Sequence, residues 1–123
     1  MTTIAGRDTR ESASRRLATT TKFFRALGDQ SRLTILSALI DGEKNVGELV
    51  ELVGLSQGRV SNHLACLKQC GFVNARRDCR FVYYSIADDE VRRLMDISEA
   101  MIARNAEQIW ACTRTSAPDT REG

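Results

Sequence analysis

Two cysteines, Cys66 and Cys70, stand four residues apart in the middle of the chain, and their spacing suits chemistry on a helix. Residues i and i+4 of an α-helix lie one above the other on the same face. Two thiols placed in this way could bind a soft metal ion or respond to an oxidant. The alternative is two small buried side chains, because cysteine is commonly found in protein cores.

Two further cysteines could add to this chemistry. Cys112 follows Trp110 near the end of the last predicted helix, where it could supply a third thiolate or remain an exposed thiol. Cys79 lies beside Arg80 in a predicted turn and is a secondary candidate for a metal ligand. All of these ligands are sulfur, and sulfur favours thiophilic ions over calcium, magnesium or manganese.

The cysteine pair must be positioned by a helix that follows a tight turn. Ser56 is a suitable N-terminal cap for a helix over residues 57–70, and Gly71 suits the left-handed residue that commonly ends a helix. Before it, Asn45 begins a capping-box pattern for a helix over residues 46–53. A helix, a three-residue turn with glycine and a second helix have the spacing of a helix-turn-helix.

The second of these helices also carries polar side chains that could contact DNA bases. Arginine pairs with guanine, and asparagine or glutamine pairs with adenine. An ordinary solvated face would carry similar residues, and His63 could instead be satisfied by a backbone carbonyl. The candidate base-contacting residues are Gln57, Arg59, Ser61, Asn62 and His63.

A β-hairpin is expected directly after this helix, with strands over residues 72–76 and 80–86, because both stretches are rich in β-branched and aromatic residues. The whole chain has a net charge of only +2, but residues 57–84 hold five basic residues against one aspartate. Such a local basic surface suits contact with phosphate or the minor groove. The hairpin arginines expected to make these contacts are Arg76, Arg77 and Arg80.

The remaining helices predict a dimer. Helices are expected over residues 12–27, over residues 32–40 with Ser31 as the cap, and over residues 88–113. The last helix would be ~38 Å long, which is more than a 13.7 kDa domain can cover. We therefore expect a homodimer that forms through the N- and C-terminal helices. The expected stripe on the last helix consists of Val91, Leu94, Met95, Ser98, Met101, Ile102, Asn105 and Ile109.

Length and composition indicate one small domain of 123 residues, of which 42% are hydrophobic. We expect an ordered domain over residues 12–114, a disordered arm over residues 1–11 and a disordered tail over residues 115–123. No apolar run approaches the ~20 residues that cross a membrane, and the N-terminus lacks the apolar core of a signal peptide. These features predict a cytoplasmic protein with reduced thiols and no membrane partner.

The order of these elements resembles the ArsR–SmtB family of metal-responsive repressors. The matching segments are Ala26–Arg32, Val46–Leu49, Val60–Leu64 with Leu67, Gly71–Val73 and Arg80–Tyr84. Gln30 stands where the family usually has proline, which removes a rigid turn residue. The resemblance implies a mainly α winged helix-turn-helix homodimer. Its metal-free form would bind a palindromic DNA operator, and its metal-bound form would release it.

The positions of the cysteines are similar to those of the cadmium- and lead-sensing branch of this family. The resemblance implies Cys66, Cys70 and Cys112 as metal ligands, and Cys112 could come from the partner chain. Other sensor types fit less well, because residues 46–53 contain no cysteine and His63 is the only histidine. Mercury-responsive members could share the arrangement. The candidate effectors are therefore Cd(II), Pb(II) and Hg(II), ahead of Zn(II).

Three other functions remain open on the sequence. A thiol redox sensor on the same scaffold could use the cysteine pair, although a disulfide between positions i and i+4 of a helix is geometrically awkward. An enzyme using Cys66 and His63 lacks a visible third residue to orient them, so we expect neither catalysis nor a small-molecule substrate. A winged helix that binds only proteins would show no salt-dependent binding to duplex DNA.

Overall fold

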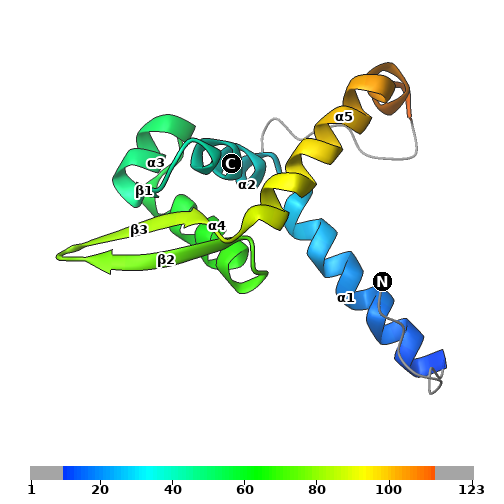
Figure 1. The fold of residues 1–123 in the computed structure, drawn as a ribbon, viewed down its shortest axis with the longest axis horizontal. Coiled ribbons are helices and arrows are strands. Elements are labelled where there is room, and N and C mark those ends of the chain that lie inside the picture. Colours follow the sequence, from blue (N-terminus) through cyan, green and yellow to red (C-terminus); the bar gives the residue numbers. More distant parts are fainter. Residues whose placement is uncertain (1–9, 113–123) are drawn as a thin grey trace.

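The computed structural model describes residues 10–112, in which helices pack together beside a small antiparallel sheet (Figure 1). This architecture confirms the predicted mainly α winged helix-turn-helix, in which α3 and α4 form the helix-turn-helix and β2 and β3 form the wing. The helices are α1 (Arg10–Leu27), α2 (Gln30–Ile40), α3 (Val46–Val53), α4 (Gln57–Gln69) and α5 (Asp89–Ala111). The strands are β1 (Lys44–Asn45), β2 (Val73–Asp78) and β3 (Phe81–Ile86), in the order β1-β3-β2.

The start of α2 corrects one prediction. Ser31 was expected to cap this helix, but Asp29 is the cap, and its Oδ2 accepts a hydrogen bond from the backbone N–H of Arg32 at 2.9 Å. The helix therefore begins at Gln30, two residues earlier than expected. The first helical position is one where proline is common. Glutamine at this position leaves the aspartate cap in place.

The two helices of the helix-turn-helix begin at the predicted caps. The backbone N–H of Glu48 donates to Asn45 Oδ1 at 2.8 Å, and the backbone N–H of Asn45 donates to Glu48 Oε1 at 2.9 Å, which completes the capping box. Gly54 ends α3 with φ at 74°, a left-handed conformation that glycine adopts without a steric penalty. Ser56 caps α4 and accepts a hydrogen bond from Arg59 N at 3.3 Å.

The core lies between α2, α3, α4 and the base of the hairpin. One side of α4 enters it completely, because Val60, Leu64 and Leu67 have no exposed surface. These three residues recur at the spacing of one helix face. The other fully buried large side chains are Ile35, Leu36, Leu39, Leu49, Phe72 and Val73.

Strand β1 was not predicted from the sequence. β1 pairs antiparallel with β3, where Lys44 lies opposite Tyr84. A strand of two residues is too short to show an alternating pattern. The predicted hairpin is present. Its strands β2 and β3 are antiparallel, and the pairing runs from Val73 opposite Ile86 to Asp78 opposite Phe81.

Helices α1 and α5 extend away from the core (Figure 1). Asp88 caps α5, and Arg92 Nη1 donates to the carbonyl oxygen of Ile40 at 3.0 Å, which ties α5 to α2. Both helices expose large apolar side chains that nothing in the described chain covers. These are Leu17, Phe24, Ile97, Met101, Ile102, Ile109 and Trp110.

The sequence predicted a continuous last helix, whereas the structure interrupts it. Asn105 lies inside α5 with φ at −127° and ψ at 17°, values outside the helical range. Its side-chain amide donates to the carbonyl oxygen of Met101 at 2.9 Å, and such a local bond competes with the helical backbone. The predicted apolar stripe is therefore interrupted before Ile109.

The described residues, 10–112, include only part of the predicted arm and none of the predicted tail. Helix α1 begins at Arg10, two residues before the expected start at residue 12. The rest of the predicted arm, residues 1–9, and the predicted tail, residues 115–123, lie outside the described residues. In the part of the chain that is described, no helix is both long and apolar enough to span a bilayer.

Replacing Asn45 by alanine tests the capping box. We expect Asn45→Ala to lower the free energy of unfolding by about 1 kcal/mol, because the first turn of α3 loses its side-chain acceptor. Chemical denaturation at fixed protein concentration measures the change. Asn62→Ala is the matched control, since Asn62 is exposed on α4. Equal destabilisation by both variants would contradict the role of the cap.

Candidate functional site

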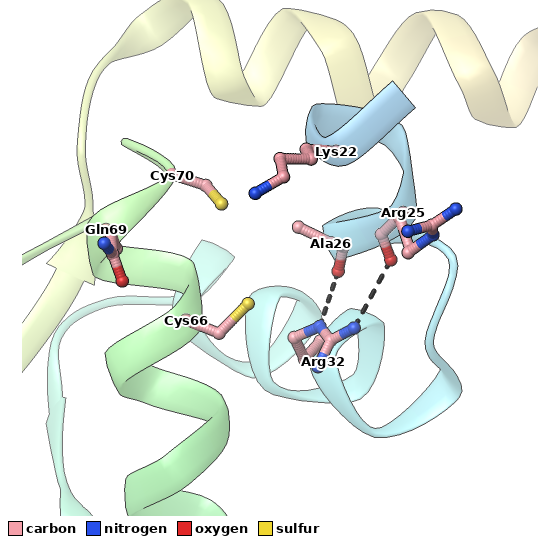
Figure 2. Close-up of a pocket in the computed structure, with 7 residues that line it drawn as sticks. All are labelled: Lys22, Arg25, Ala26, Arg32, Cys66, Gln69 and Cys70. Atoms are coloured by element: carbon pink, nitrogen blue, oxygen red, sulfur yellow. Dashed lines mark hydrogen bonds between the residues drawn. The ribbon is translucent and has the colours of Figure 1, made fainter. Parts of the chain in front are cut away.

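Cys66 and Cys70 lie at the C-terminal end of α4 and face α1 (Figure 2). Burial of Leu67 in the core leaves both cysteines on the flank of the helix, where each is half-buried against the core. Figure 2 shows both sulfur atoms directed into one pocket between α4 and α1. The structure thus brings this predicted pair together on one helix face.

The pocket has a volume of about 420 Å³. Helix α4 forms one wall, and the C-terminal part of α1 and the start of α2 form the other (Figure 2). The two thiols therefore share a space with three basic residues and no acidic one. The lining residues are Lys22, Arg25, Ala26, Arg32, Cys66, Gln69 and Cys70.

The electrostatics of the pocket keep Cys70 protonated near neutral pH. Desolvation raises the pKa of the Cys70 thiol above its ordinary 9.0, and the charge and hydrogen bond of Cys66 raise it further. Arg32 and Lys22 act in the opposite direction on the same pKa, but with smaller effect. Because the thiolate is the form that binds metals, a metal ion must displace this proton.

Arg32 connects the pocket to the middle of α4. Its Nε donates to the carbonyl oxygen of Ala26 at 2.7 Å, and its Nη2 donates to that of Arg25 at 3.3 Å. Its Nη1 lies 3.4 Å from Nδ1 of His63, and that nitrogen lies 3.9 Å from Asp29 Oδ2. The sequence placed Arg32 in a matching segment but did not single it out, since these contacts join residues far apart along the chain.

The other two cysteines do not join this pair within one chain. Among residues 10–112, no three His, Cys, Asp or Glu side chains are grouped closely enough to hold a metal ion. Cys112 caps the end of α5, and Cys79 lies at the hairpin turn with φ at 60°; both are exposed. A third cysteine ligand would therefore have to come from a second copy of the chain.

The residues proposed to read DNA fall into two groups on α4. Four of them are exposed, whereas only 15% of the His63 side chain is accessible and it lies against α2. The contacts of His63 with Arg32 and Asp29 give it a role in packing, and base contact by His63 stays a prediction. The four exposed residues are Gln57, Arg59, Ser61 and Asn62.

Among the wing arginines, Arg76 is already paired. Its Nε donates to Glu43 Oε2 at 3.0 Å, and its Nη1 lies 3.6 Å from Asp78 Oδ2. The guanidinium also lies over the ring of Tyr83, 5.1 Å from its centre. The hydrogen bond from Arg76 lowers the pKa of Glu43, so this pair stays charged near neutral pH.

Arg77 and Arg80 differ from Arg76. Both side chains are exposed, and neither has an ion pair within the described residues. Arg77 and Arg80 are therefore available to bind a DNA phosphate. Arg76 would first have to break its ion pairs with Glu43 and Asp78. The wing therefore offers a smaller basic surface than its three arginines predicted.

The sequence matches a known family and two well-covered relatives. Residues 29–75 match the profile of the arsR family of bacterial regulatory proteins. The chain is 46% identical over 96 residues to a probable mercury resistance operon repressor of Streptomyces lividans, covering 78% of this chain and 77% of that protein. It is 37% identical over 114 residues to the transcriptional regulator CmtR of Mycobacterium bovis, covering 92% of each.

A solved structure supports the same relationship. The homodimeric winged helix-turn-helix DNA-binding domain of Mb0332 from Mycobacterium bovis, described as a possible ArsR-family regulator, superposes with a TM-score of 0.73. The two sequences are 31% identical, and the match covers 85% of this chain and 95% of that one. The fold and the order of elements are thus shared with a DNA-binding domain.

The different surroundings of the wing arginines predict different salt effects. We expect Arg77→Ala and Arg80→Ala each to reduce the slope of log affinity against log salt by about 1, because each variant removes one cation from the DNA phosphates. Arg76→Ala should change the slope less, because its charge is balanced by Glu43 and Asp78. Fluorescence anisotropy with a duplex selected from random DNA by the metal-free protein measures the slopes. A larger change for Arg76→Ala than for the other two would refute this assignment.

Proposed function

The chain belongs to the arsR family of bacterial regulatory proteins, and we propose that it represses transcription until a thiophilic metal ion releases it from DNA. The observation that carries the proposal is the pair of sulfur atoms in one pocket on the helix expected to read DNA. Metal binding and DNA binding would then use the two ends of the same rigid element.

The DNA-binding form would be a homodimer. Helices α1 and α5 expose apolar side chains that a second copy of the chain can cover. In a symmetric dimer the two α4 helices would enter successive major grooves ~34 Å apart, which requires a palindromic site. The exposed polar residues at the start of α4 would contact bases, and Arg77 and Arg80 would contact the backbone.

The metal ligands would be Cys66, Cys70 and Cys112. The first two already point into one pocket from α4, and Cys112 would come from the partner chain of the dimer, because it does not join the pair within the described chain. Three thiolates without histidine favour Cd(II), Pb(II) or Hg(II). A relative named as a probable mercury resistance operon repressor supports a metal effector. Cys79 lies at the wing tip and is a weaker candidate.

The link to DNA affinity would run through α4 and Arg32. Drawing the two thiolates around an ion would shift the C-terminal end of α4 relative to α1. Arg32 contacts α1, lines the pocket and lies beside His63. A shift at the pocket would therefore change the contacts of Arg32 with both α1 and His63. A tenfold loss of DNA affinity needs only ~1.4 kcal/mol, within the usual ~1–3 kcal/mol of allosteric coupling.

A thiol redox sensor is the second candidate, and one observation favours it. The sulfur atoms of Cys66 and Cys70 are both directed into the same pocket. A two-electron oxidant could join them, because Cys70 is the cap that follows the last residue of α4 and its backbone is less constrained than the helix interior. Peroxide sensitivity of DNA binding in metal-free buffer would support this function.

Serine substitutions test the proposed ligands. We expect Cys66→Ser and Cys70→Ser each to retain the DNA affinity of the metal-free protein. Each variant should lose most of the effect of Cd(II) on that affinity, because it removes one of the two sulfur donors inside the pocket. Cys112→Ser should weaken the response without abolishing it. Cys79→Ser is the matched control and should respond normally. The measurement is the DNA dissociation constant with and without metal, and normal responses from the Cys66 and Cys70 variants would refute the ligand assignment.

The raised pKa of Cys70 predicts that metal affinity depends on pH. Because its thiol is protonated below its pKa and the ion binds the thiolate, Cd(II) affinity should rise from pH 6 to pH 8 by about tenfold per pH unit for each proton displaced. Competition with a chelator measures the slope. In the Cys70→Ser variant the slope of log affinity against pH should be smaller by about one unit, because one fewer proton is displaced. A slope near zero in the unmodified protein would contradict the account.

A further inference from the structure

The pocket that holds the two thiols is larger than a metal ion needs. Its volume of about 420 Å³ lies in the range of roughly 300–1,000 Å³ typical of small-molecule sites. Within the described residues it offers two sulfur atoms and no third donor group for a thiophilic ion. The remaining space could therefore hold a molecule that arrives with the metal.

The charges around the pocket favour an anion. Its lining includes Lys22, Arg25 and Arg32 and no acidic residue. An approaching bare divalent cation would be repelled by these charges. A divalent metal ion bound by three thiolates forms a complex with a net charge of −1. The three basic residues would attract this complex.

Lys22 is the cation best placed to contact such an anion. Figure 2 shows its ammonium group directed toward the sulfur of Cys70, and among the described residues it has no hydrogen bond or ion pair. Arg32 instead donates to two backbone carbonyls. The side chain of Arg25 points away from both cysteines (Figure 2).

We propose that the pocket receives the metal as a complex with a low-molecular-weight thiol that bears a carboxylate. The metal would bind Cys66 and Cys70, the retained small thiolate would fill the third position, and its carboxylate would pair with Lys22. This inference rests on the proposed metal-sensing function. Cys112 of a second copy of the chain would replace the small thiol in a later step.

The transfer is a ligand exchange without oxidation or reduction. A neutral complex of M(II) with two small thiolates meets the thiols of Cys66 and Cys70. Two sulfur–metal bonds form, and one bond to a small thiolate breaks. The departing thiolate takes one of the two cysteine protons, and the second proton goes to solvent. The product is an M(II) trithiolate of net charge −1, not counting the carboxylate.

The test compares two small thiols that differ in the carboxylate. Cd(II) is supplied to the full-length Cys112→Ser protein, which lacks the competing cysteine, together with either mercaptopropionate or mercaptoethanol. Native mass spectrometry detects the complex of protein, cadmium and thiol, and thiolate-to-cadmium absorption gives its affinity. Lys22→Met removes the proposed partner of the carboxylate. Lys68→Met is the matched control, because Lys68 is exposed on α4 and does not line the pocket.

The expected result is a ternary complex that holds mercaptopropionate about threefold to fivefold more tightly than mercaptoethanol, the size of effect typical of one exposed ion pair. The preference should persist in Lys68→Met and disappear in Lys22→Met. Cadmium binding without any preference, or with a preference that survives Lys22→Met, would overturn the inference and leave the metal sensor intact. No cadmium binding with either thiol would overturn both.

Discussion

Burial of one face of α4 is the constraint on which the rest of the structure depends. Val60, Leu64 and Leu67 have no exposed surface, so rotation of this helix about its axis would expose apolar area to water. With that face fixed, the exposed polar residues stand at the start of the helix, and Cys66 and Cys70 stand on its flank, facing α1. The packing of this one helix thus sets both the surface proposed to bind DNA and the pocket proposed to bind metal.

The pocket contains features that shift the pKa of Cys70 in opposite directions. Burial and the neighbouring thiol raise the pKa of Cys70, while Arg32 and Lys22 lower it. The raised pKa favours the protonated thiol of Cys70 near neutral pH, and the nearby cations would stabilise thiolates if the proposed ion binds. In that proposal the sulfur donors would select against hard ions, and the basic residues would repel cations that carry no ligands.

Local patterns in the sequence predicted the elements that carry the site. The capping box at Asn45 and the cap at Ser56 are signals within a few residues, and the structure confirms both of them. Contacts between distant segments were not predictable in this way. The guanidinium of Arg32 beside His63 and the pairing of Arg76 with Glu43 depend on how helices and strands meet, and strand β1 exists only because β3 lies beside it.

The most direct test is a titration of the complex between the full-length protein and a duplex that it selects from random DNA. Adding Hg(II) or Cd(II) while recording both thiolate-to-metal absorption and DNA anisotropy compares occupancy of the sulfur site with DNA release in one sample. The account predicts that both signals change together and end at the same metal equivalents, with DNA affinity at least about tenfold weaker. Sulfur sites that fill completely while the DNA stays bound with unchanged affinity would contradict it.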